Sequence, residues 1–218
     1  MPSAFDQSTY QVRLEWGAGG LARLAPADIL VIVDVLRFSS TVADAVAAGA
    51  EVELDGAARW SRNGAAVAAA AEHETVLLGG LRNAGAVARA IVTLQNRRQA
   101  RTSVAIIAAG EVDAAGALRF AVEDHLGAGA VIAALTDLGI DHTSPDAAVA
   151  AEGFRALRRA LRHMVSASGS AREIAEGVDA TARMTAAGIV PTSPASAAEV
   201  DAVDAVPILR DGRFVAFD

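Results

Sequence analysis

The sequence predicts an α/β protein with a mostly parallel sheet and helices on both faces. Two apolar runs, "ILVIVDVL" (29–36) and "SVAIIAAG" (103–110), are continuous rather than alternating, which is typical of central strands covered on both faces. Segments of helical length separate the apolar runs, and this alternation favours parallel strands joined by right-handed crossovers. Antiparallel strands are expected at the ends. We expect one domain over residues 1–218, in which a mostly helical part at about 144–200 is a candidate subdomain.

The first half of the chain supplies four of the expected strands. "QVRLEWG" (11–17) alternates apolar and polar residues and predicts a strand with one solvated face. The buried strand from residue 29 is followed by a helix over 41–50, which Gly49 closes. A short strand, an alanine-rich helix, another strand and a helix ending in arginines are then expected over 51–55, 57–72, 75–80 and 83–98.

The second half is expected to be richer in helix. After the strand at 103–110, a helix is expected over 116–135, and its glycines Gly127 and Gly129 favour close approach to a neighbour. Ser144 as N-cap and Pro145 at the first helical position begin a helix that runs to about residue 163. Ser170 and Glu173 have the spacing of a capping box for another helix. The last segment, 206–218, predicts a hairpin around Asp211-Gly212.

Composition excludes several classes of function. The chain has no cysteine, which excludes disulfides, thiolate zinc sites and a cysteine nucleophile. Its four histidines are scattered, so a zinc site is not expected. A net charge of −7 without a basic tract argues against nucleic acid as a partner. No apolar run approaches the roughly 18 residues of a membrane span, and no basic-then-apolar leader opens the chain, so we expect no membrane partner and a cytoplasmic protein.

The stretch "DVLRFSST" is the first candidate site. Asp34 lies near the carboxyl end of a predicted strand, where ligands bind in open α/β sheets. Arg37 is suited to bind phosphate or sulfonate, and Asp34 to hold a divalent cation. The hydroxyls of Ser39, Ser40 and Thr41 stand at the start of the next helix, which offers free N–H groups to an anion. A purely structural alternative remains open, in which the hydroxyls cap the helix and Asp34 pairs with Arg37.

Two further loops are expected at the same edge of the sheet. Glu111 follows the strand at 103–110, and Glu123 and Asp124 lie on the helix expected after it. Arg119 and Glu123 are spaced i,i+4 on that helix, so a surface salt bridge is the alternative for them. Arg82 follows the strand at 75–80 and is either a ligand for an anion or part of a plain turn. Together the loops indicate a cleft that carries both acids and arginines.

Several of these segments together resemble the 2-phosphosulfolactate phosphatases. The resemblance rests on "VDVLRFSSTVADAVAAGA", "LRNAGAVARA", "AAGE", "GALRFAVEDHLGAGAVIAAL" and "SGSARE", which run in order over most of the chain. It implies a magnesium-dependent phosphatase that acts on (R)-2-phospho-3-sulfolactate, a step toward coenzyme M. It also implies an α/β fold with the site between strand ends, and a homodimer.

The resemblance and the positions of the three loops together suggest roles for individual residues. Asp34, Arg37 and Glu123 are the expected catalytic residues, and Asp34, Glu111 and Asp124 are the expected ligands of Mg²⁺. Substrate binding is expected from the arginines and hydroxyls of the three loops: Arg37, Ser39, Ser40, Thr41, Arg82 and Arg119. One departure is visible, because the family's Asn-Gly-Thr or Asn-Gly-Ser loop is not found in context and Asn63-Gly64 is followed by alanines. The alternative function is therefore a non-catalytic or repurposed member of the family that binds an anionic metabolite.

Overall fold

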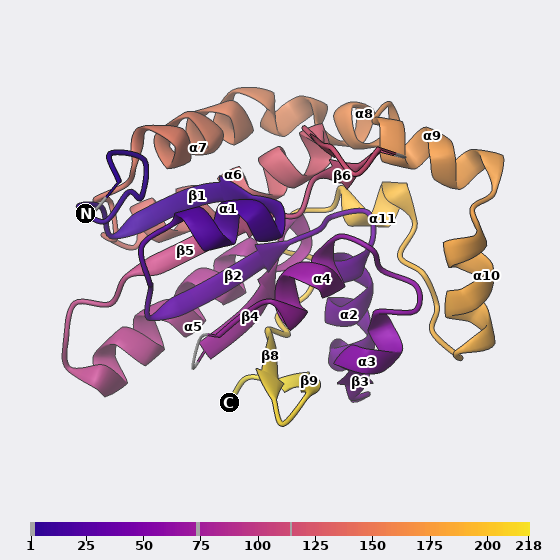
Figure 1. Ribbon diagram of the computed structural model, residues 1–218, viewed down its shortest axis with the longest axis horizontal. Helices are drawn as coiled ribbons and strands as arrows, with labels where there is room; N and C mark the ends of the chain where they lie inside the picture. The colour runs from indigo at the N-terminus through magenta and orange to yellow at the C-terminus, as the bar shows by residue number, and fades with distance from the viewer. Residues whose placement is uncertain (1–2, 73–74, 114) are drawn as a thin grey trace.

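A computed structural model describes residues 3–72, 75–113 and 115–218, and it confirms the α/β class (Figure 1). The central sheet has seven strands in the order β1-β5-β2-β4-β8-β9-β3. Four neighbouring strands are parallel: β1 (Val12–Trp16), β5 (Val104–Ala108), β2 (Ile29–Val33) and β4 (Thr75–Gly79). The antiparallel strands follow at one edge: β8 (Pro207–Arg210), β9 (Arg213–Ala216) and β3 (Val52–Glu53).

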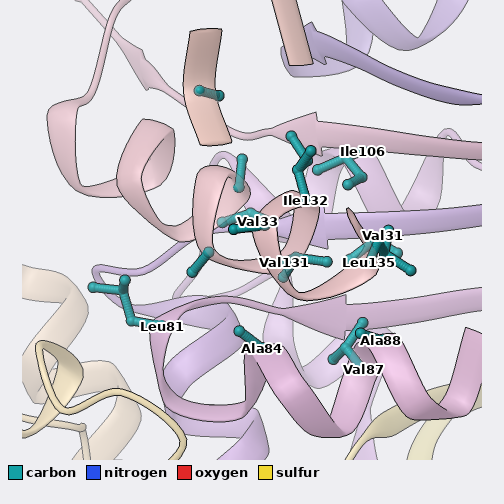
Figure 2. Packing of buried hydrophobic residues seen from close by; sticks show 14 of the residues in the cluster. Val31, Val33, Leu81, Ala84, Val87, Ala88, Ile106, Val131, Ile132 and Leu135 are labelled. Carbon is teal, nitrogen blue, oxygen red and sulfur yellow. The ribbon is translucent and has the colours of Figure 1, made fainter. Parts of the chain in front are cut away.

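The buried central strand has a core on each of its faces. Successive side chains of a strand point to opposite faces, and Val31 and Val33 of β2 belong to one buried cluster while Leu30 and Ile32 belong to the other. Figure 2 shows Val31 and Val33 among side chains of α5 (Ala84–Arg98) and α6 (Val122–Asp137). The opposite face is covered by α1 (Gly17–Arg23), α2 (Phe38–Ala47), α3 (Leu54–Ala57) and α4 (Gly64–Ala69).

The C-terminal part is largely helical, as expected. It contains α7 (Pro145–Leu157), α8 (Leu161–Ser166), α9 (Gly169–Glu176), α10 (Asp179–Ala186) and α11 (Pro194–Ala197). The close approach expected of the α6 glycines is confirmed, because a Cβ on Gly129 would lie 2.1 Å from the carbonyl oxygen of Ala150 in α7. No helix among the described residues is both long and apolar enough to cross a membrane.

Several predicted boundaries are wrong. The helix expected over 116–135 begins only at Val122, because residues 111–119 form a small hairpin of β6 (Glu111–Val112) and β7 (Leu118–Arg119). The Asp113 side chain accepts the N–H of Ala115 and of Ala117, which stabilises the turn of this hairpin. The expected helix 57–72 is reduced to α4, and the helix from Ser144 ends at Leu157, followed by a 3₁₀ turn and α8.

Antiparallel strands were expected at both ends of the chain, and among the described residues they are found at only one of them. The hairpin is confirmed, with Asp211 and Gly212 both at positive φ as its tight turn requires. The strand at 11–17 is also confirmed, but it pairs in parallel with β5, so the antiparallel strands gather at one edge. The carboxyl ends of β1, β5, β2 and β4 therefore lie together, which places the loops after them side by side.

Candidate active site

A cavity of about 630 Å³ lies beyond the carboxyl ends of β2 and β5. These neighbouring strands lead to helices on opposite faces of the sheet, α2 on one and α6 on the other. Such a divergence opens a crevice between the two loops, which is where α/β sheets bind ligands. Charged residues from four parts of the chain line the cavity: Asp34, Arg37, Arg62, Glu111, Asp113, Arg119, Glu173, Asp179 and Arg183.

Asp34 is the most constrained acid of the cavity. It is 7% exposed, and its two carboxylate oxygens accept the backbone N–H groups of Phe38 (3.2 Å) and Gly64 (3.0 Å). Burial raises the pKa of Asp34 to about 6; the two N–H groups oppose that rise, and the nearby carboxylates of Glu123 and Glu111 add to it. The result is an oriented carboxylate whose charge is costly until a cation approaches it.

Arg37 stands beside Asp34, at the residue that precedes α2. It is 9% exposed and lines the cavity, and burial lowers the pKa of its guanidinium while the charge of Asp34 opposes this. Arg37 forms no ion pair and no side-chain hydrogen bond with any described residue. The structural pairing of Asp34 with Arg37 is therefore not observed, and the guanidinium has all its donors available to a ligand.

The three hydroxyls expected to bind substrate form hydrogen bonds within the protein instead. The Ser39 hydroxyl donates to the carbonyl of Ile32 and accepts the N–H of Asp34, and that of Ser40 donates to the carbonyl of Val35. Thr41 accepts the N–H of Thr192. None of Ser39, Ser40 and Thr41 lines the cavity. They hold the loop around Asp34 in place rather than facing a ligand.

Glu111 and Arg119 reach the cavity from the hairpin β6–β7, where they are directly paired across the two strands. The placement of Arg119 on a helix with Glu123 is wrong, so the i,i+4 salt bridge does not form. The guanidinium of Arg119 instead lies over Gly169 at the start of α9, where a Cβ would come within 2.6 Å of it. Arg119 is thus a second arginine without an ion pair among the described residues.

Glu123 and Asp124 lie behind the cavity wall and do not line it. The oxygens of Asp124 accept the N–H of Val35 (2.7 Å) and of Gly110 (2.9 Å), which ties the loop after β2 to the loop after β5. Burial, followed by the charges of Asp34 and Glu123, raises the pKa of Asp124 well above its ordinary value. Glu123 is 2% exposed and accepts the hydroxyl of Ser170.

Arg82 is placed away from Asp34. It lines a second cavity of about 1030 Å³ and contacts Asp44 of α2 at 2.7 Å. Its guanidinium also donates to the carbonyl of Ser196 and meets Glu199 at 3.3 Å. The structure therefore brings Asp34, Arg37, Glu111 and Arg119 together and leaves Arg82 outside the group.

The Asn-Gly pair that looked out of context belongs to the cavity. Asn63 lines it, and its amide lies 3.5 Å from Glu111, while the N–H of Gly64 binds Asp34. A side chain at residue 64 would not fit, because its Cβ would lie 2.7 Å from the Asp34 carboxylate and 2.5 Å from Phe38. An Asn-Gly pair therefore does lie at the cavity, although the residue after the glycine is Ala65 and not the serine or threonine expected of the family's loop.

Sequence reasoning missed the part of the cavity that α9 and α10 supply. Figure 1 shows these two helices at one side of the molecule, beyond α2 and α4. Ser170, which was expected to cap α9, faces Glu123 instead, because Ser168 is the cap and accepts the N–H of Ala171. Arg183 of α10 and Trp60 also line the cavity. No local pattern marks these residues, since only the tertiary fold brings them to Asp34.

The acids of the cavity fit a magnesium ion that takes few ligands from the protein. Asp34 and Glu111 both line the cavity, and carboxylate oxygen is the ligand type that Mg²⁺ prefers. Asp124 does not fit, because its side chain does not line the cavity and instead joins the loops after β2 and β5. Within the described ranges no group of three or more His, Cys, Asp or Glu forms a metal cage. Magnesium commonly completes its shell with water and substrate oxygens, so two carboxylates suffice.

Comparison with known families identifies the family of the chain. A family model described as 2-phosphosulpholactate phosphatase matches residues 58–212, which is more than two thirds of the chain. The match includes Asn63, Glu111, Arg119 and Arg183 and begins after the segment of Asp34 and Arg37. No curated protein matches the chain. The chain therefore belongs to the 2-phosphosulpholactate phosphatase family, a family of hydrolases that remove phosphate.

Proposed function

We propose that this protein is a magnesium-dependent phosphatase that converts 2-phospho-3-sulfolactate to 3-sulfolactate and inorganic phosphate. The carrying observation is the pairing of an oriented, buried carboxylate, Asp34, with a buried guanidinium, Arg37, that has no ion-pair partner among the described residues. A substrate phosphate is the group that suits both, because it binds arginine directly and carboxylate through a cation. Membership of the family supports 2-phospho-3-sulfolactate as the substrate.

The side chains of the cavity have different roles in such a hydrolysis. Arg37 and Arg119 bind the phosphoryl oxygens and offset the charge that builds on them as the ester P–O bond breaks. Asp34, held by the N–H groups of Phe38 and Gly64, and Glu111 are the residues that would hold magnesium. The ion would supply positive charge to the phosphoryl group and lower the pKa of a water molecule. Water provides the oxygen of the new P–O bond and the proton of the product alcohol.

The test is phosphate release from 2-phospho-3-sulfolactate by the wild type, with magnesium and with a chelator. We expect release only with magnesium, and a loss of at least about 100-fold in Asp34→Asn. Arg59→Met is the matched control, because Arg59 is exposed and lines only the second cavity. Equal rates in Asp34→Asn and the wild type would show that Asp34 has no role in catalysis. Equal rates with magnesium and with chelator would show that the reaction does not depend on a metal.

A second candidate is a repurposed family member that binds an anionic metabolite without turnover. One observation favours it: Asn63 lines the cavity, but Asn63-Gly64 is followed by Ala65 rather than by the serine or threonine expected of the family's loop. This candidate predicts calorimetric binding of 2-phospho-3-sulfolactate to the wild type with no phosphate released over hours. Ala65→Ser, which restores the hydroxyl, is the variant that separates the two candidates, because only a phosphatase with a weakened loop gains activity from it.

A further inference from the structure

The inner wall of the cavity contains polar groups that the mechanism above does not use. The indole N–H of Trp60 and the Nε–H of Arg183 are shielded from water, yet neither meets an acceptor within the described residues. Trp60 is 5% exposed, and both residues line the cavity. A buried donor without an acceptor destabilises the folded state, and folded proteins rarely contain one. Two such donors on one wall indicate an acceptor that enters from outside the chain.

Arg183 has a nearby carboxylate that it does not use. Asp179 lies four residues earlier on α10, the spacing at which a helical ion pair normally forms, and it lines the same cavity. No ion pair joins Arg183 to Asp179 or to any other described acid. Met184, the next residue, is 1% exposed and packs with Phe38 and Trp60 in the core cluster, which fixes this turn of α10 against the body of the protein. The guanidinium is thus held at the wall without a counter-charge.

The wall formed by Trp60 and Arg183 is distinct from the wall that holds the phosphate. Trp60 and Arg183 line both the first and the second cavity, whereas Asp34, Glu111 and Arg119 line only the first. Trp60 is connected to the Asp34 end through Phe38, whose ring lies 5.7 Å from the indole. A ligand whose phosphate lies between Asp34 and Arg37 must therefore extend along the cavity to reach Arg183.

We propose that Arg183 and Trp60 form a subsite for a second anionic group of the substrate, a sulfonate or carboxylate carried on the same small molecule as the phosphate. The proposal rests on the proposed function for the position of the phosphate. An oxyanion with three or two oxygens accepts from both N–H groups and neutralises Arg183. The subsite makes the protein selective for compact phosphate esters that carry an additional anion. Simple phosphate esters have no group that can bind Arg183 and Trp60.

The experiment compares two substrates in three proteins. 2-Phospho-3-sulfolactate carries additional anions, and phenyl phosphate carries none. We expect Arg183→Met to lower kcat/KM for 2-phospho-3-sulfolactate by about 10- to 100-fold and to leave kcat/KM for phenyl phosphate within about twofold. Arg59→Met, which removes an arginine that lines only the second cavity, should change neither. An equal fall for both substrates, or no change for either, would overturn the subsite.

Binding of the product separates a failed subsite from a failed phosphatase. Calorimetric titration with 3-sulfolactate, which has no phosphate, needs no turnover. We expect Arg183→Met to weaken this binding by about the same 10- to 100-fold, and Trp60→Phe, which keeps an aromatic ring beside Phe38 but lacks the N–H, to weaken it by about 3- to 10-fold. Weakened binding in a protein that releases no phosphate supports the subsite and rejects the phosphatase. Unchanged binding in Arg183→Met rejects the subsite whether or not phosphate is released.

Discussion

The two cavities that meet at Trp60 and Arg183 each contain a well-buried arginine, and these two arginines differ in their partners. In the second cavity Arg82 contacts Asp44 and Glu199 and donates to the carbonyl of Ser196, so its charge is balanced by the protein itself. In the first cavity the arginines form no ion pair with any described residue: Arg37, Arg62, Arg119 and Arg183. The sequence alone does not separate the two kinds, since Arg82 and Arg37 both follow a buried strand and precede a helix.

The difference supports the proposal that the first cavity binds the ligand. Removing a guanidinium from water is costly unless a partner compensates it. Arg82 is compensated when the chain folds, so it contributes to stability. Arg37 is as buried as Arg82 but lacks that compensation, so its partner must come from solution. The carboxylates follow the same division, because Asp44 is paired with Arg82 while Asp34 forms no ion pair with any described residue.

The largest effect is expected from Arg37→Met. Loss of the buried guanidinium that we propose binds the phosphoryl group should lower kcat/KM for 2-phospho-3-sulfolactate by about 100- to 1,000-fold, since it removes charge where the transition state needs it. The thermal midpoint should stay close to that of the wild type, because no ion pair among the described residues is broken. Steady-state kinetics and calorimetry on the same preparation test this. A large fall in the midpoint would make Arg37 structural and erase the contrast with Arg82.

The pH dependence of stability should differ between the wild type and Asp34→Asn. The pKa of Asp34 is raised from 3.8 to about 6, so between these values the folded protein holds a proton that the unfolded chain releases. The free energy of unfolding that this group contributes is therefore present below about pH 4 and is lost as pH rises to about 6. Measured by denaturant titration in chelator, the wild type should lose roughly 3 kcal/mol relative to Asp34→Asn across this window. Parallel profiles would contradict the raised pKa.

A smaller effect is expected from Arg82→Met, and on stability rather than on turnover. The substitution leaves Asp44 without its closest cation, and Arg82 is only 11% exposed while Asp44 is 30% exposed. The free energy of unfolding should fall by about 1–3 kcal/mol, and kcat/KM should stay within about twofold. Denaturant titration and steady-state kinetics give the two numbers. If activity falls while stability holds, Arg82 contacts the substrate, as the sequence indicated.

The sequence predicts the scaffold well because its signals are local. Continuous apolar runs identify β2 and β5, and the rule that ligands bind at carboxyl ends of strands finds Asp34 and Glu111. The same rule fails for Arg82. Its loop also follows the carboxyl end of a strand, β4, but its guanidinium contacts Asp44 of α2 and does not reach the cavity of Asp34. Arg183 leaves no local signal, and Ser170 is marked in the sequence only as part of a capping box. Ser170 reaches the cavity beside Glu123, 47 residues earlier, and α10 packs in a cluster with Phe38 and Trp60, more than a hundred residues earlier. Neither period nor spacing encodes these contacts.

Each of the two cavities has a hydroxyl that donates to a carboxylate, and these two hydrogen bonds should differ in their effect on turnover. Thr192 donates to Asp44 in the second cavity, and Ser170 donates to Glu123 behind the first. Both Thr192→Val and Ser170→Ala should cost about 1 kcal/mol of stability, the usual value of one such bond. Only Ser170→Ala should also lower kcat/KM, by about 10-fold, because Glu123 is one of the charges that act on Asp34. Thermal midpoints and kinetics of the two variants side by side test this. Equal kinetic losses would mean that the second cavity also takes part in turnover, whereas no loss in either would confine Ser170 to holding α9 in place.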